Sequence, residues 1–208
     1  MDRSGKVADL VREAKTEDWG RVLADIRRCT ICAGSLPFPP NPVLQGSATA
    51  RILLISQAPG NRAHLANRPF ADASGNRLRA WLGLAPPVFY DPAQIAIMPM
   101  AFCYPGTSGS GDRPPPPICS ATWHHRIRAL MPALKLTLLI GRAAQSAYLQ
   151  ESGNLSATVF AARACRGGMI PLPHPSWHNN AWLAQNPWFE AEMLPRLRRR
   201  IAGILAAP

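Results

Sequence analysis

The sequence predicts an α/β fold: a three-layer sandwich with a central four-stranded parallel sheet flanked by helices. Short apolar runs, each bounded by Gly or Pro, alternate with segments of helical spacing. Strands that are apolar on both faces and alternate with helices are typical of a parallel sheet that is covered on both sides. The predicted strands are residues 51–56, 94–99, 135–140 and 168–172.

The predicted helices lie between and after these strands, and two further helices are expected before the first strand. Pro195 should kink or interrupt the last helix, because proline has no backbone N–H to donate. The tract 105–117 ("PGTSGSGDRPPPP") predicts a long connection rather than a linker, because apolar segments continue on both sides. Residues 1–208 are therefore predicted to form a single domain. The predicted helices are residues 74–84, 119–131, 142–150 and 186–207.

Composition excludes several classes of protein. The 208 residues are 47% hydrophobic and 17% charged, which is typical of a globular domain and excludes a wholly disordered chain. The apolar runs are far shorter than a membrane span, and the first fifteen residues are charged, unlike a secretion signal. We therefore expect a monomer of the bacterial cytosol or nucleoid that has no membrane partner.

The strongly basic charge favours a polyanionic partner. Lys and Arg number 23 against 12 Asp and Glu, which gives a net charge of +11, and nearly all the basic residues are arginine. The planar guanidinium suits phosphate, so nucleic acid is favoured. Two alternatives stay open. One is that the arginine bias partly reflects genome base composition, and the other is that "RLRRR" (196–200) is simply the solvated face of a helix.

The loops after the predicted strands are where a site is expected. In open α/β sheets, ligands bind beyond the carboxyl ends of the strands. These loops carry "SQAPGN" (56–61), "MAFCYPG" (100–106), "GRAAQ" (141–145) and "LPHPSWHNN" (172–180). The last one concentrates histidine, asparagine and tryptophan side chains where two prolines prevent a helix.

Several of these segments, in their order along the chain, resemble the uracil-DNA glycosylase superfamily. "ILLISQAPG" (52–60) is similar to a strand followed by Gly-Glu-Ala-Pro-Gly in the iron–sulfur-containing bacterial and archaeal branches, with Ser56 and Gln57 in place of Gly-Glu. "NRPFADASGNRLRAWL" (67–82) resembles a Gly-Arg-Pro-Phe segment, and "LPHPS" (172–176) matches a His-Pro-Ser motif. Ordered motifs are more specific than any one of them.

The resemblance implies hydrolysis of the N-glycosidic bond of uracil in DNA, after the base has been flipped out of the duplex. His174 would donate a hydrogen bond to uracil O2 as negative charge develops there. Phe70 would stack on the base, although it could equally be a core aromatic. Gln57 would contact the base or position water, together with the backbone near Ala58, Pro59 and Gly60.

The same resemblance places DNA contacts on the loop after the fourth strand. Pro175 and Ser176 would meet the DNA backbone. Trp177 or His178 would fill the space left by the flipped base, and Trp177 could instead be a packing residue. No lysine lies in a candidate loop, and an enzyme that also cuts the strand generally needs an amine for a Schiff base. A monofunctional glycosylase is therefore expected.

Two departures from the family pattern affect the site. Ala58 stands where the best-known members have a water-activating aspartate, and Asp72 is the nearest acidic substitute, unless it is only a helix cap. The segment 95–103 contains no asparagine to read uracil. Backbone groups near Met100 and Ala101 could read the base instead, or a side chain could reach in from Asn61, Asn179 or Asn180. Hypoxanthine or xanthine therefore stays possible as the substrate, as does an inactive DNA-binding member.

Four cysteines predict a cofactor site. Cys29 and Cys32 form a Cys-x-x-Cys pair, and Cys103 and Cys119 flank a proline-rich segment that resembles the one before the family's last cluster ligand. Four thiolates suit a [4Fe–4S] cluster, with zinc or no metal as the alternatives. Cys165 has no counterpart in the family pattern and is predicted to be a core residue.

Overall fold

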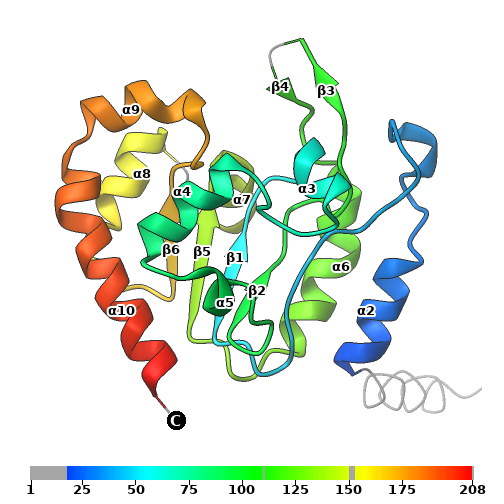
Figure 1. Ribbon diagram of the computed structural model, residues 1–208, viewed down its shortest axis with the longest axis horizontal. Helices are drawn as coiled ribbons and strands as arrows, with labels where there is room; N and C mark the ends of the chain where they lie inside the picture. Colours follow the sequence, from blue (N-terminus) through cyan, green and yellow to red (C-terminus); the bar gives the residue numbers. More distant parts are fainter. Residues whose placement is uncertain (1–17, 110, 150–152, 208) are drawn as a thin grey trace, which may run out of the picture.

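A four-stranded parallel sheet forms the centre of the computed structural model, which describes residues 18–109, 111–149 and 153–207. The strands are ordered β2-β1-β5-β6 across the sheet, and all three pairings are parallel (Figure 1). Each strand lies within a predicted one. Their bounds are β1 Ile52–Ile55, β2 Ile95–Ile97, β5 Leu136–Ile140 and β6 Met169–Leu172.

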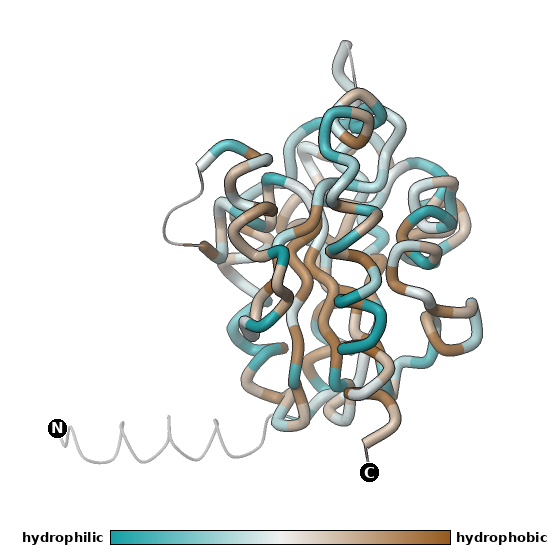
Figure 2. Tube along the Cα trace, turned by 90° about the vertical axis from the view of Figure 1, so that its left-hand side faces the viewer, coloured by the Kyte–Doolittle hydropathy of each residue, from teal (hydrophilic) through white to brown (hydrophobic). Residues whose placement is uncertain are grey.

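The two faces of the sheet bury two separate apolar cores. Ile52 and Leu54 belong to one core, and the alternate residues Leu53 and Ile55 belong to the other. This division follows because successive strand side chains point to opposite faces. The strands are apolar along their length (Figure 2). The three-layer α/β sandwich predicted from the sequence is therefore confirmed.

Helices cover both faces. The first core contains residues from α4 (Ala73–Leu82), α8 (Leu155–Ala161) and α10 (Leu194–Ala206), and partly buried residues of α9 (Asn180–Gln185) pack against it. The second contains residues from α2 (Trp19–Arg27), α6 (Pro117–Ala129) and α7 (Arg142–Tyr148). Shorter elements are α3 Asn61–Leu65, α5 Pro86–Phe89, and the 3-10 turns Ala33–Ser35 and Trp177–Asn179.

The described chain before β1 holds one α-helix and one 3-10 turn, α2 and Ala33–Ser35. The sequence predicted two helices there, and residues 1–17 lie outside the described residues. The C-terminal helical segment is interrupted as predicted. A π-helical stretch, Phe189–Met193, precedes α10, and Pro195 is near the start of α10. Proline cannot donate an N–H in a helix interior, so the regular α-helical bonding changes before it.

The tract 105–117, which was predicted to be a long ordered or semi-ordered connection, includes secondary structure that its composition did not predict. It contains a small antiparallel hairpin formed by β3 (Thr107–Ser108) and β4 (Gly111–Asp112). The hairpin projects beyond the carboxyl ends of the sheet (Figure 1). Among the described residues, no helix is both long and apolar enough to cross a membrane.

Candidate functional site

A cavity of about 550 Å³ opens beyond the carboxyl ends of β1 and β6. Its walls come from the loops after these strands, from the segment before α4 and from the β3–β4 hairpin. The topology therefore places a cavity where the parallel sheet predicts a ligand. The cavity brings together the sequence-predicted residues Gln57, Ala58, Pro59, Gly60, Phe70, Asp72, His174, Ser176, Trp177 and His178.

Three sequence-predicted residues do not line this cavity. Asn61 is exposed at the start of α3, and Pro175 is buried. The Asn179 side chain donates from Nδ2 to the carbonyl of His174 at 2.7 Å. Asn179 therefore holds the loop that carries His174.

Other candidates for reading the base are already hydrogen-bonded. The Met100 N–H donates to the carbonyl of Ser56 at 2.8 Å, and the Ala101 N–H donates to that of Gln57 at 3.2 Å. The hypothesis of backbone recognition is therefore wrong for these two N–H groups, because they continue the pairing of β2 with β1. Asn180 Oδ1 accepts from Arg77 at 2.8 Å.

The Gln57 side-chain amide, in contrast, has no hydrogen-bond partner among the residues that the structure describes. An amide carries both donors and an acceptor, so it can pair with a nucleobase edge. Gln57 is thus the free amide in the cavity.

His174 follows β6 in a tightly packed loop. Burial lowers the pKa of His174 from its ordinary value of 6.5, and the opposing charge of Asp72 raises it less. The imidazole is therefore neutral at pH 7. Gly141 has a φ of +81°, and a Cβ added there would lie 3.3 Å from His174 Cβ. This glycine lets the start of α7 approach the histidine closely.

Phe70 is fixed in an unfavourable backbone conformation. Its φ of 54° is left-handed, which costs about 1–3 kcal/mol for a bulky residue. Its carbonyl accepts from the Tyr90 hydroxyl at 3.0 Å. A Cβ on Gly75 would lie 1.8 Å from the same carbonyl oxygen, so only glycine fits there. The Phe70 ring is 9% exposed and belongs to the core, yet it also lines the cavity.

Asp72 is the N-cap of α4. Its Oδ1 accepts from the Gly75 N–H at 2.8 Å, so the helix-cap interpretation is confirmed. The side chain also lines the cavity. Capping uses one carboxylate oxygen and therefore does not exclude a second role.

Trp177 and His178 lie at the rim. Trp177 is 71% exposed, and its ring stacks on His178 with centroids 3.8 Å apart. Arg77 donates to the Ser176 carbonyl at 3.2 Å and holds this loop from α4. An exposed tryptophan beside a cavity is unusual for a packing residue and suits a side chain that inserts into DNA.

Sequence reasoning missed several lining residues. Ser108, Gly111 and Asp112 come from the hairpin, which was interpreted as a connection. The "SGSG" turn residues are a hairpin signal, but nothing local shows where the hairpin folds. The other missed residues are Ser56, Ala63, Pro69, Ser74 and Pro99.

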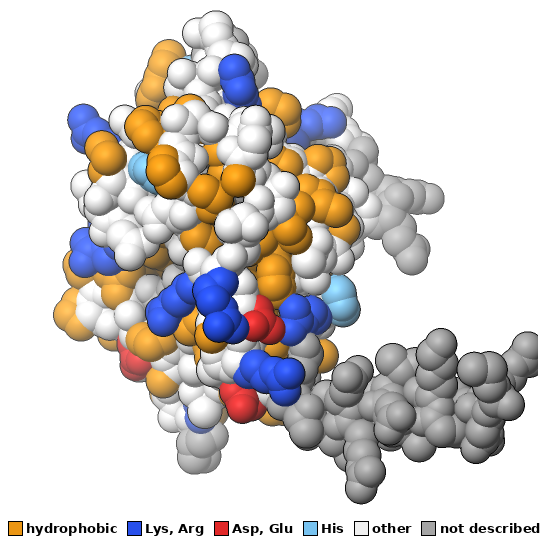
Figure 3. Space-filling model, turned by 90° about the vertical axis from the view of Figure 1, so that its right-hand side faces the viewer, with side chains coloured by type: hydrophobic (Ala, Val, Ile, Leu, Met, Phe, Trp, Pro, Cys, Tyr) orange, Lys and Arg blue, Asp and Glu red, His pale blue; other side chains and the backbone are white. Residues whose placement is uncertain are grey.

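Four cysteines line a second, apolar pocket. Cys29, Cys32, Cys103 and Cys119 surround it and form no disulfide. Burial raises the pKa of Cys103 to about 11 and that of Cys119 to about 12. The face of the molecule that carries α2 is rich in apolar side chains (Figure 3), and Ile31, between the first two cysteines, is 54% exposed. Cys165 is buried and stands apart in the first core, as predicted.

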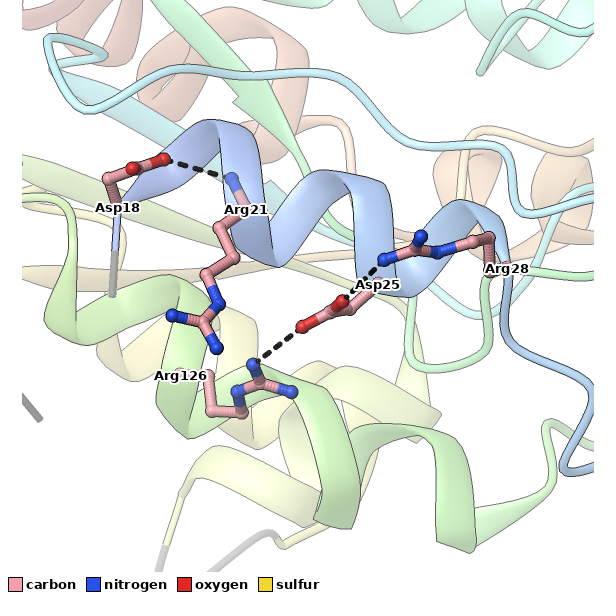
Figure 4. A network of polar contacts seen from close by, with 5 residues as sticks. All are labelled: Asp18, Arg21, Asp25, Arg28 and Arg126. Carbon is pink, nitrogen blue, oxygen red and sulfur yellow. Dashed lines mark hydrogen bonds and ion pairs between the residues drawn. The ribbon is translucent and has the colours of Figure 1, made fainter. Parts of the chain in front are cut away.

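A polar network holds α2 against α6, and these helices carry two of the cysteines at or near their ends. Asp25 pairs with Arg28 at 3.1 Å and with Arg126 of α6 at 3.2 Å (Figure 4). Hydrogen bonds from Arg126 and Arg28 lower the pKa of Asp25. Cys29 follows α2 and Cys119 is in the first turn of α6, so the network helps to fix their spacing.

Four thiols around one apolar pocket are ligands that both a [4Fe–4S] cluster and a zinc ion accept. No group of three or more metal-ligating side chains among the described residues is arranged to hold one metal ion. A zinc ion requires four sulfurs about 2.3 Å from its centre. A [4Fe–4S] cluster takes four cysteine thiolates as its ligands, one at each iron.

Two comparisons relate the chain to known proteins. A solution NMR structure of a candidate uracil DNA glycosylase from Methanosarcina acetivorans matches 79% of this chain and 97% of its own, with 14% identity and a TM-score of 0.44. The family model of the uracil DNA glycosylase superfamily matches residues 44–198. This match includes the loops that form the cavity. The chain therefore belongs to the uracil DNA glycosylase superfamily, which assigns it to the DNA glycosylases, hydrolases that act on DNA.

Proposed function

We propose that this protein is a monofunctional glycosylase that removes uracil from DNA by hydrolysing the N-glycosidic bond. The observation that carries the proposal is a neutral, tightly held His174 in the same cavity as Phe70 and the free amide of Gln57. These groups supply what the reaction needs: a donor for the leaving base, a stacking surface and a group that can pair with the base edge.

His174 acts on the leaving group. As the bond between N1 and C1′ breaks, its electron pair moves to uracil, and charge accumulates at O2. A donor fixed in place before the reaction stabilises that charge without reorganisation. A neutral imidazole carries one N–H donor and can serve in this role. The Asn179 side chain keeps His174 in position through its carbonyl.

The flipped base stacks on Phe70 and is recognised by Gln57. Flipping costs a few kcal/mol, and a mispaired uracil costs least. Trp177 with His178 fills the space left in the duplex, and Ser176 meets the DNA backbone. Pro175 is buried, so it shapes this loop and is not assigned a DNA contact. The net charge of +11 contributes affinity that does not depend on sequence.

Strand cutting through a Schiff base is not part of the proposal. It requires an amine, and no lysine lines the cavity among the described residues. Lys135 precedes β5 and so lies at the opposite end of the sheet, while Lys6 and Lys15 lie outside the described residues.

Cys29, Cys32, Cys103 and Cys119 would hold a [4Fe–4S] cluster. The cluster would supply a structural crosslink between the segment after α2 and the loop after β2. Iron and sulfide analysis of anaerobically purified protein tests this assignment. About four irons per chain are expected, and zinc or an absence of metal would contradict it.

One assay tests the activity. Purified protein is incubated with duplexes that contain a single uracil, hypoxanthine or xanthine, and alkali then cleaves the abasic sites. We expect strand breaks with uracil after alkali treatment and none before it. Cleavage of hypoxanthine or xanthine alone would overturn the uracil assignment. If no abasic site forms with any of the three substrates, the protein is a DNA-binding protein without catalytic activity.

A further inference from the structure

Asp112 is an acidic side chain that no part of the proposed mechanism uses. It stands on β4 of the hairpin, where its backbone pairs with Thr107 of β3. The next residue, Arg113, donates its N–H to the Gly106 carbonyl at 2.8 Å. The backbone on both sides of Asp112 is therefore held, while its carboxylate forms no hydrogen bond or ion pair with the described residues.

The Asp112 side chain points into the cavity. A Cβ built on Gly60 would lie 3.6 Å from Asp112 Oδ2 and 4.0 Å from Asp72 Oδ2. Two carboxylates from distant parts of the chain thus converge beside Gly60. Asp72 uses its Oδ1 to cap α4, so Asp112 is the carboxylate with both oxygens free.

The electrostatics of this cavity are opposite to those of the whole chain. The protein has a net charge of +11, yet the cavity lining contains two aspartates and, among the described residues, no arginine or lysine. Carboxylates at this place oppose binding of the DNA polyanion. They favour positive charge, and positive charge develops on the sugar when a glycosidic bond breaks.

We propose that Asp112 is a catalytic residue of this site and acts as the base for the attacking water. This inference rests on the proposed function. As the C1′–N1 bond breaks and its electron pair leaves with uracil, the water oxygen bonds to C1′. Asp112 takes one proton from that water. The products are an abasic sugar with a hydroxyl at C1′, the uracil anion and a protonated Asp112, whose proton then passes to solvent or to the uracil anion.

The surroundings of Asp112 agree with this role. Partial burial and the charge of Asp72 raise the pKa of Asp112, and His178 opposes that shift. A carboxylate with a raised pKa is a stronger base. Ala58 supplies no side-chain base in the loop after β1, so the hairpin brings the group from elsewhere in the chain.

The test compares cleavage with binding in Asp112→Asn. Under single-turnover conditions with a uracil duplex, we expect the rate to fall about 10²-fold or more. Affinity for a duplex with a 2′-fluorinated, cleavage-resistant uracil nucleotide should stay equal or increase, because a negative charge is removed. A purely structural role would not lower the rate while preserving or increasing the affinity. Asp112→Glu should recover part of the rate.

Thr107→Ala is the matched control, because Thr107 pairs with Asp112 in the hairpin but does not line the cavity. Its rate should equal that of the unaltered protein. If the cleavage rate of Asp112→Asn stays within twofold of that of the unaltered protein, the role of Asp112 is wrong but the proposed function stands. The same holds if the cleavage rate and the DNA affinity of Asp112→Asn fall in parallel. If the unaltered protein releases no uracil, the proposed function fails and this inference fails with it.

Discussion

Two pockets lie on either side of the segment 99–103 in this protein, but their chemistry differs. Pro99 lines the polar cavity of about 550 Å³, and three residues later Phe102 lines the cysteine pocket of about 20 Å³. The first has room for a nucleobase and contains polar groups without partners. The second is lined by thiols and apolar side chains. The unpaired groups mark the candidate catalytic site, whereas the thiols mark the pocket proposed to hold the cluster.

His124 connects the two pockets. Its Nε2 lies 3.0 Å from the Pro99 carbonyl and its Nδ1 lies 2.7 Å from the Tyr148 hydroxyl. On the same helix, Cys119 Sγ accepts from the Phe102 N–H at 3.4 Å. Helix α6 thus supports the segment 99–103 at two points. A disturbance of the cysteine pocket should therefore reach the polar cavity.

The largest expected effect comes from removing the donor in the polar cavity. His174→Ala should lower the single-turnover rate of base release about 10²–10³-fold, because one donor to a developing anion is lost. Affinity for a cleavage-resistant duplex should change little. His125→Ala, at an exposed position of α6 outside both pockets, is the control. Full activity of His174→Ala would remove the histidine from the mechanism.

The next effect tests the cysteine pocket. Cys119→Ser should lose most of the bound iron and lower Tm by about 5 °C or more, since 1 kcal/mol corresponds to about 2–4 °C for a chain of this size. The rate of base release should also fall, because α6 supports the segment 99–103 between the two pockets. Cys165→Ala should keep its iron, because Cys165 lies in the other core. Equal iron content in both variants would contradict the assigned ligands.

A third prediction concerns pH and the connecting histidine. Burial lowers the pKa of His124 to about 4 from 6.5, so the unfolded chain binds more protons between these values. The free energy of unfolding should therefore fall by about 3 kcal/mol as pH decreases from 6.5 to 4. The lowered pKa of His174 also makes the free energy of unfolding fall as pH decreases.

Urea unfolding at several pH values measures this dependence. His124→Phe should reduce the slope and should cost about 1–3 kcal/mol at pH 7, because the Pro99 carbonyl and the Tyr148 hydroxyl lose their partner. An unchanged slope in His124→Phe would show that other groups cause the pH dependence.

The smallest effect is expected at the α2–α6 contact. Asp25→Asn removes ion pairs with Arg28 and Arg126 that lie near the surface. Exposed pairs contribute little and are screened by salt. We expect a small decrease of Tm at low ionic strength that disappears at about 1 M salt. The lowered pKa of Asp25 means that this contribution is lost when pH falls below 3.8. A large decrease that persists in salt would indicate a packing role.

Much of the fold could be predicted because its signals are local. The apolar runs predict all four strands of the central sheet, since each strand is buried on both faces. Pro195 predicts a break because its missing N–H acts within one helical turn. The hairpin in 105–117 was missed, because its strands are two residues long and carry no alternating apolar pattern.

The sequence by itself determined the α/β class, the loops that carry the candidate site, and the polar and aromatic side chains of the "LPHPSWHNN" loop. Only the tertiary structure decided which of those side chains are free. Gln57 is uncommitted, whereas Asn179 and the N–H groups of Met100 and Ala101 are already bonded. Asp112 lines the cavity because the hairpin lies beyond the carboxyl ends of the strands. Hydrogen-bond partners and carboxylate proximity depend on residues far apart in the chain, so residue types and spacing could not show them.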